Sequence, residues 1–224
     1  MTYFEKDFIL FFQELKKNNT KEWFDENRKR YEKNVKKPFA NFVGTMIGRI
    51  RDFEPSLLIE PKECILRINR DIRFSKDKTP YNSHVTAFIS KGGKKDKTRP
   101  GFFLRLTPDE IGIMIGCFQP DKTQLKKIRN FIAADPGLFS KTINDKKFKD
   151  RFGELKGEEH KRIPTEFKEA YSTEPLIARK QFYAVAVLDP NILLKEGLIE
   201  QLMEYYHAAR PVNFYLTKAM EQPA

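Results

Sequence analysis

The stretch GFFLRLTPDEIGIMIGCF, residues 101–118, decides the fold. Two runs of alternating apolar residues flank Thr107–Glu110, and Pro108 suits the second position of a tight turn. Successive side chains of a strand point to opposite faces of its sheet, so each run offers one face to a core. The stretch therefore predicts an antiparallel hairpin with its turn at Thr107–Glu110.

More strands are expected on both sides of this hairpin in the sequence. ECILRINRDIRF, residues 63–74, alternates apolar and polar side chains, which predicts a strand with Ile68 and Phe74 on its apolar face. HVTAFIS, residues 84–90, and QFYAVAVL, residues 181–188, are rich in strand-forming residues. The strands are consecutive through most of this region, which is typical of an antiparallel sheet.

Helical patterns lie at the two ends of the chain. Apolar residues recur at helical spacing over residues 4–15 and 23–50, and a further helical region is expected from Asn191 onward. Because helices and strands are segregated along the chain, we predict an α+β fold: an antiparallel sheet flanked by N-terminal and C-terminal helices. No internal repeat or linker is apparent, so a single domain over residues 1–224 is expected.

Four residues set the expected limits of these helices. Asn19 and Glu22 form a capping-box pattern at the start of the second helix. Pro38 is expected to kink or split that helix, and Pro211 is expected to interrupt the C-terminal one, because proline lacks a backbone N–H group.

The chain carries 42 basic and 31 acidic residues, a formal charge of +11, which favours anionic partners. No apolar run is long enough for a membrane span, and the N-terminus resembles a helix rather than a signal peptide. Cys64 and Cys117 lie in apolar runs, which predicts buried, reduced thiols. We therefore expect a soluble, cytoplasmic protein.

The segment RINRDIRFSKDKTPY, residues 67–81, concentrates three arginines and two lysines around only two acids. Arginine presents a planar fork that suits phosphate or carboxylate oxygens, and lysine adds a mobile positive charge. The segment therefore predicts a ligand-binding site for a phosphorylated or carboxylated compound. The candidate residues are Arg67, Arg70, Asp71, Arg73, Ser75, Lys76, Asp77, Lys78, Tyr81 and His84.

Arg70 is the most informative of these residues, because it falls among the apolar positions of the alternation. It either pairs internally, lies at a strand end or bulge, or points into a functional cleft. In a structural interpretation, Arg70 and Arg73 pair with Asp71 or with acids from the helices and fasten the strand to the loop. In a functional interpretation they form an anion pocket with Arg67 and the two lysines. A solvated basic edge is the third alternative.

Other chemistry in this segment is less specific. Ser75 next to Lys76 could act as a nucleophile with an amine base, but turn formation is the simpler explanation of the pair. Asp71 and Asp77 could hold Mg²⁺ beside a phosphate, yet no further carboxylates cluster with them. The histidines lack metal-ligand spacing, and no phosphate-binding glycine motif is present. We therefore expect no metal and no cofactor, and catalysis stays open.

The motif RDIRFSKDKTPY, residues 70–81, resembles a bacterial and fungal family called domain of unknown function 2461. The hairpin PGFFLRLTPDEIGIMIGCFQP is similar to the same family, and the resemblance extends over nearly the whole chain. Two places depart from the family pattern. Asn82 stands where lysine is common, and HKRIPTEF stands where the family usually has a basic run that contains proline and glycine. The resemblance implies a single-domain soluble protein and supplies no reaction.

Two classes of function follow. The first is a small-ligand protein with its anion pocket in residues 67–81, and whether it is an enzyme is left open. The second is a non-catalytic module that binds nucleic acid or acidic proteins through the Lys91–Arg99 loop, KGGKKDKTR. That loop has no aromatic residue to stack on bases, so its binding would be blind to sequence and sensitive to salt. A scaffold whose charge serves only solubility is a blander third possibility.

Overall fold

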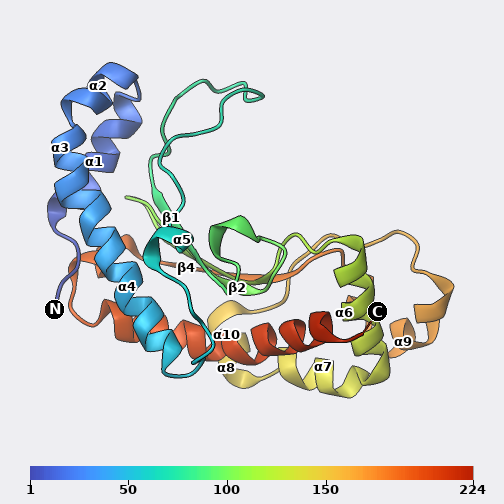
Figure 1. Ribbon diagram of the computed structural model, residues 1–224. Coiled ribbons are helices and arrows are strands. Elements are labelled where there is room, and N and C mark those ends of the chain that lie inside the picture. Colours follow the sequence, from blue (N-terminus) through green and yellow to red (C-terminus); the bar gives the residue numbers. More distant parts are fainter. Residues whose placement is uncertain (224) are drawn as a thin grey trace. The chain divides into compact units, whose positions relative to one another are not determined.

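A computed structural model describes residues 1–223 (Figure 1). The chain divides into two compact units. The first comprises residues 1–89, 103–113 and 187–203, and the second comprises residues 90–102, 114–186 and 204–224. Whether they behave as the single domain expected from the sequence stays a prediction.

The sheet has four strands in the order β1-β2-β3-β4. Their bounds are β1 Val85–Ile89, β2 Gly101–Leu106, β3 Ile111–Cys117 and β4 Phe182–Leu188. The turn that joins β2 to β3 is closed by the N–H of Thr107, which donates to the carbonyl of Glu110 at 3.0 Å. The predicted hairpin and the predicted α+β class, an antiparallel sheet with N-terminal and C-terminal helices, are confirmed.

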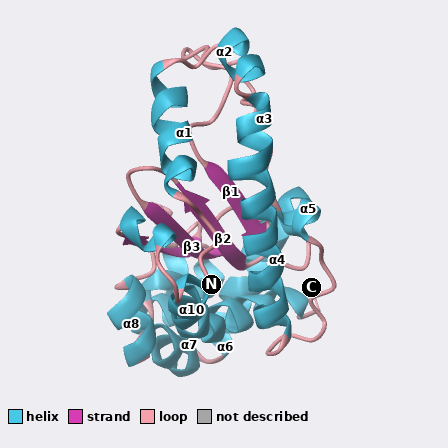
Figure 2. Cartoon of the chain, turned by 90° about the vertical axis from the view of Figure 1, so that its left-hand side faces the viewer, coloured by secondary structure: helices cyan, strands magenta, loops and turns pink. Residues whose placement is uncertain are grey.

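The first unit contains the N-terminal helices, which Figure 2 shows beside β1. They are α1 Lys6–Lys17, α2 Lys21–Glu26, α3 Arg28–Tyr31, α4 Lys37–Arg51 and α5 Pro61–Cys64. A π-helical turn over Glu32–Lys36 joins α3 to α4. Proline has no N–H to donate to the carbonyl four residues before it, so Pro38 cannot complete a regular α-helical ladder there. The predicted interruption by Pro38 is therefore a change of helix type.

Phenylalanine rings fill the core between these helices. Phe8, Phe11 and Phe12 of α1 are fully buried, as is Phe42 of α4. At the surface of this core, the guanidinium of Arg30 bonds to the carboxylates of both Asp7 and Glu14 on α1, with contacts down to 2.6 Å. These bonds fix α3 against α1.

The second unit holds most of the remaining helices. They are α6 Lys122–Ala134, α7 Pro136–Ile143, α8 Lys146–Phe152 and α9 Lys168–Thr173, with 3₁₀ turns at Gly93–Lys95, Thr165–Phe167 and Pro175–Ala178. Asp121, Asp135 and Asp145 each accept a bond from the backbone of the helix that follows, as N-caps. Inside this unit Arg129 is only 6% exposed, and its guanidinium donates to the carbonyls of residues 177–179 at the end of the last 3₁₀ turn.

The C-terminal helix corrects one expectation. After a 3₁₀ turn at Pro190–Leu194, α10 runs from Leu198 to Glu221 without a break at Pro211. Asn213, two residues later, accepts a bond from the N–H of Gly116 at 2.8 Å and donates to the carbonyl of Gly101 at 3.2 Å. Tertiary bonds of this kind hold the helix in place beyond the proline and offset the loss of one intrahelical bond.

The strand expected over residues 63–74 is wrong. Its first residues instead form α5, which begins with Pro61 and is closed by a capping box between Glu60 and Glu63. Beyond α5 only isolated bridges remain, at Ile65 with Ala87 and further along the chain. The alternating pattern holds as far as buried Ile68, but Phe74 is 96% exposed rather than packed in a core.

Both cysteines are buried and, in the described part of the chain, neither forms a disulfide, as expected. Burial raises the pKa of the Cys117 thiol to about 12, which keeps it protonated and unreactive at neutral pH. Across residues 1–223, the helices that reach the length of a membrane span are not apolar enough to form one.

Candidate functional site

The segment Arg67–Tyr81, here called the basic loop, connects α5 to β1 and extends away from the strand (Figure 1). Two backbone bonds close its base: the N–H of Arg70 donates to the carbonyl of Pro80, and the N–H of Asn82 donates to the carbonyl of Ile68, both at 2.8 Å. Between these bonds the backbone forms no regular strand or helix. Its shape therefore depends on side-chain contacts.

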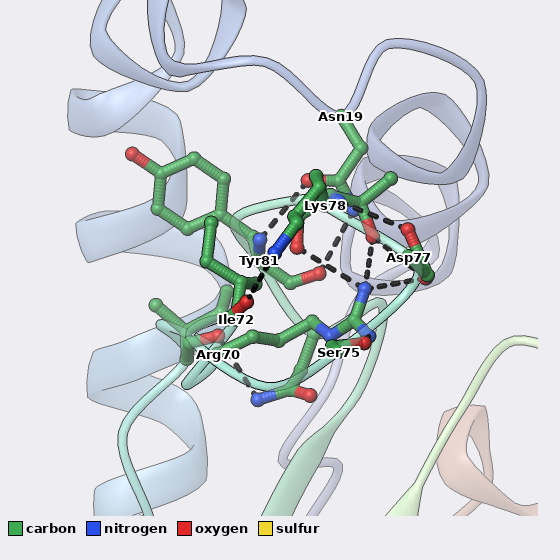
Figure 3. Close-up of polar contacts among 10 residues, drawn as sticks. Asn19, Arg70, Ile72, Ser75, Asp77, Lys78 and Tyr81 are labelled. Atoms are coloured by element: carbon green, nitrogen blue, oxygen red, sulfur yellow. Dashed lines mark hydrogen bonds and ion pairs between the residues drawn. The ribbon is translucent and has the colours of Figure 1, made fainter.

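Arg70 makes most of those contacts, as Figure 3 shows. Its Nη1 donates to Asp77 Oδ2 at 2.6 Å, to the Thr79 carbonyl at 3.1 Å, and to the Thr79 hydroxyl. Its Nη2 lies 3.5 Å from the hydroxyl of Ser75. The side chain is 24% exposed, so water competes only in part for these bonds. One guanidinium thus ties the two limbs of the loop together.

Asp77 completes this network. Its carboxylate accepts from the N–H of Thr79 at 2.9 Å as well as from Arg70. The backbone bond from Thr79, followed by the Arg70 bond and the Thr79 hydroxyl, lowers the pKa of Asp77 from 3.8 to about 2. The carboxylate is therefore charged throughout the neutral and mildly acidic range.

Arg73 pairs with a different acid. Its Nε and Nη2 donate to the two carboxylate oxygens of Asp71 at 2.9 and 2.7 Å. This pairing lowers the pKa of Asp71. The Arg73 side chain is nevertheless 76% exposed, so the pair lies in water and fixes little of the fold.

Arg67 and Lys76 are also exposed, and within residues 1–223 their side chains make no hydrogen bond or ion pair. Together with Arg73, they are called the outer cations. Lys78 differs from them, because its ammonium donates to the carbonyl of Ile72 at 3.0 Å and so helps to shape the loop (Figure 3).

A reverse turn lies at residues 72–75. The N–H of Ser75 donates to the carbonyl of Ile72 at 3.3 Å, which leaves Arg73 and Phe74 as the two central residues. Bonds from Lys78 to the Ile72 carbonyl and from Arg70 to Ser75 hold both ends of this turn. Phe74 is therefore presented to solvent by an ordered turn.

The end of the basic loop is anchored in the first unit. Tyr81 is buried and stacks on Phe24 of α2, with ring centroids 4.0 Å apart. Asn19 brackets its backbone: Asn19 Oδ1 accepts from the N–H of Tyr81 at 3.1 Å and Asn19 Nδ2 donates to its carbonyl at 2.8 Å (Figure 3). The cap of α2 is Thr20 rather than Asn19, whose side chain is used for this anchor.

His84 directly precedes β1 and is half-buried. Burial, followed by the positive charges of Arg105 and Arg70, lowers the pKa of its imidazole below 6.5. The ring is therefore neutral at pH 7, and it contributes no positive charge to an anion site.

The sequence-predicted residues thus fall into three groups. Arg70, Ser75, Asp77 and Lys78 belong to the internal bonds of the loop, and Tyr81 to its anchor. Arg73 with Asp71 forms a surface pair, and Arg67 and Lys76 are exposed on the same loop. Arg73 pairs with Asp71, as in the structural interpretation, whereas Arg70 pairs with Asp77 of the same loop and not with Asp71 or an acid from the helices. Thr79 and Asn19 are not among the sequence-predicted residues, although both are central to the geometry of the loop.

The Lys91–Arg99 loop has a simpler arrangement. Asp96 accepts from the N–H and hydroxyl of Thr98 and from Arg99 Nε, which gives the loop an internal acid–base contact. Lys91, Lys95 and Lys97 are exposed on it. Among residues 1–223, no group of three or more His, Cys, Asp or Glu side chains is arranged to hold a metal ion.

The low pKa of Asp77 predicts how the stability of the basic loop changes in acid. The pKa is lower in the folded loop than in the unfolded chain, so ionised Asp77 stabilises the loop above about pH 4. This contribution is lost as the pH falls toward 2. In carbon NMR the Asp77 carboxyl signal should titrate near pH 2, and Arg70→Ala should move that midpoint toward 3.8. A wild-type midpoint near 3.8 would contradict the network.

Comparison with known proteins gives a family and no more. No curated protein matches the chain. Residues 7–215 match the family model described as conserved hypothetical protein, DUF2461, and this match includes the basic loop and all four strands. The chain therefore belongs to the DUF2461 family.

Proposed function

We propose that this protein binds an anionic, phosphorylated or carboxylated ligand at the outer cations of the basic loop. The observation that carries the proposal is that the arginines of the loop differ in their contacts. Arg70 makes internal hydrogen bonds that set the shape of the loop, whereas Arg67, Arg73 and Lys76 are exposed on it. No catalytic role is assigned to any of them.

Rigidity is the physical reason for preferring this site. Ordering flexible side chains and loops weakens binding, so a loop already held by Arg70, Asp77 and Thr79 binds with a smaller entropic cost. Charged hydrogen bonds to phosphate or carboxylate then add to the affinity. Because the outer cations are exposed, the site suits a ligand that lies across a surface more than one enclosed in a cavity.

A second candidate is the Lys91–Arg99 loop, which would bind nucleic acid or an acidic protein. Its exposed lysines support this alternative. Its binding would rest on charge alone, and its affinity would fall steeply with salt. The cytoplasmic location expected from the sequence is likewise a proposal.

Matched triple variants separate the two candidates. Arg67, Arg73 and Lys76 are changed to Gln in one protein, and Lys91, Lys95 and Lys97 in the other, so both lose the same charge. With inorganic polyphosphate as the probe in isothermal titration calorimetry, the first variant should bind on the order of 100-fold more weakly, because three charged contacts are lost. The second should change by less than about fivefold.

The pattern of losses decides the outcome. Equal losses in the two variants would mean that net charge alone attracts polyphosphate, and the proposal would fail. A loss confined to the second variant would transfer the function to the Lys91–Arg99 loop. Unfolding curves in urea should be unchanged for both, since all six side chains are on the surface.

A further inference from the structure

We infer that the anion bound by the basic loop is single-stranded nucleic acid, and that Phe74 stacks on one of its bases. This inference rests on the proposed function and adds the class of ligand. Its first support is the exposure of Phe74, which is 96% accessible to solvent. Phe74 lies in the centre of the turn at residues 72–75, where a polar residue would not reduce the stability of the core.

Single exposed apolar residues are ordinary on protein surfaces, so exposure alone does not distinguish Phe74. What distinguishes it is its setting. The turn is held at both ends by Lys78 and Arg70, so the ring is carried on an ordered backbone. The sequence also places it beside Arg73, with Arg67 and Lys76 on the same loop.

Arg73 lies over one face of the Phe74 ring. Its guanidinium carbon lies 5.9 Å from the centroid of Phe74. Aromatic rings stack on bases of any sequence, and a guanidinium plane stacks on bases as well as binding phosphate. An aromatic ring with adjacent arginines is thus the combination used by surfaces that bind single strands. The Lys91–Arg99 loop has charge but no such ring.

The same chemistry disfavours two other anions. In a duplex, the faces of the bases are covered by their neighbours, so Phe74 would gain no partner there. An anionic membrane would accept the ring, but the loop offers it only one fully exposed apolar side chain. A flexible strand can place its phosphates near the outer cations and one base on the ring.

The test compares two labelled oligomers of about 12 units, within the size range of single-strand sites. One is oligothymidylate, and the other has the same phosphates and sugars but no bases. In fluorescence anisotropy the wild-type protein should bind the thymidylate about tenfold more tightly, since one stacked base contributes this order of affinity. Phe74→Ala should reduce thymidylate binding to the abasic level and leave abasic binding unchanged.

Phe74→Leu is the matched control, because leucine keeps an apolar side chain without a π-system. It should behave like Phe74→Ala if stacking is the interaction. If Phe74→Leu binds thymidylate as well as wild type does, generic apolar contact replaces stacking and the inference fails. Both variants should unfold at the wild-type urea concentration, because the ring makes no core contact.

Three further outcomes separate this inference from the proposed function. Equal wild-type affinity for the two oligomers, with polyphosphate binding intact, would overturn the inference and leave the proposed function standing. Loss of binding to phosphatidylserine vesicles in Phe74→Ala, with no loss for thymidylate, would assign the ring to a lipid surface instead. If the outer cations matter for neither oligomer nor for polyphosphate, the proposed function fails and the inference with it.

Discussion

Replacing Arg70 with alanine is expected to release the basic loop, with amide hydrogen exchange over residues 68–82 rising about tenfold or more. Arg70 joins Asp77, Thr79 and Ser75 on the opposite limb, and the described loop has no regular ladder of backbone bonds to replace it. The N–H groups of Arg70 and Asn82, which close the base, should show the largest change. Exchange followed by mass spectrometry measures it.

Arg73→Ala is the control, because it also removes one arginine and one ion pair from the same loop. The Arg73–Asp71 pair lies in water and holds no other segment, so exchange should remain at the wild-type rate. If the two variants exchange alike, Arg70 does not organise the loop. Arg70→Ala should also weaken polyphosphate binding while keeping every outer cation, because the loop must then be ordered on binding.

The largest loss of stability is expected for Gly116→Ala in β3. Gly116 has φ +87°, and a Cβ atom there would lie 2.1 Å from the carbonyl oxygen of Phe182 and 2.9 Å from Tyr183 Cα. These are backbone atoms of the neighbouring strand, so the clash cannot be relieved by turning a side chain. We expect the free energy of unfolding to fall by about 3 kcal/mol or more, measured by urea denaturation.

Gly153→Ala separates the clash from the backbone strain. Gly153 has a similar φ of +71°, but no atom lies within 4 Å of the position of its Cβ. Its cost should be limited to the backbone strain of φ +71° and ψ −103°, about 1–3 kcal/mol. Equal effects at the two positions would mean that β4 does not approach Gly116 as closely as described.

The fold was predictable where local patterns are sufficient. The hairpin of residues 101–118 carries its own alternation and its own turn, and both are local properties of the chain. Pro211 shows the limit of such reasoning. A proline normally ends a helix, but the bonds of Asn213 to Gly116 and Gly101 join residues about 100 positions apart, and no local pattern contains them.

The basic loop shows the same limit at the candidate site. The alternation of residues 63–74 is typical of a strand, yet regular pairing is confined to isolated bridges and Phe74 reaches solvent. Arg70 is identifiable from the sequence as the most informative residue, and internal pairing is one of the alternatives that its position predicts. Thr79 is not identifiable in this way, because its carbonyl matters through the folded backbone.

Asn19 was missed for a different reason. Its side chain binds the backbone of Tyr81, which is 62 residues away in the sequence. An asparagine before a helix is a common cap, so the local pattern favoured the capping box with Glu22. Only the tertiary fold decides between a cap and an anchor, and here Thr20 supplies the cap.

One measurement tests directly whether the basic loop binds anions. Inorganic polyphosphate is titrated into the nitrogen-15-labelled protein, and the backbone amide signals and arginine Nε signals are followed together. Saturable shifts should centre on Arg67, on residues 73–76 and on the side-chain Nε of Arg73, with Lys91–Arg99 little affected. Shifts that spread over the basic surface without saturating, or that centre on Lys91–Arg99, would contradict a binding site on this loop.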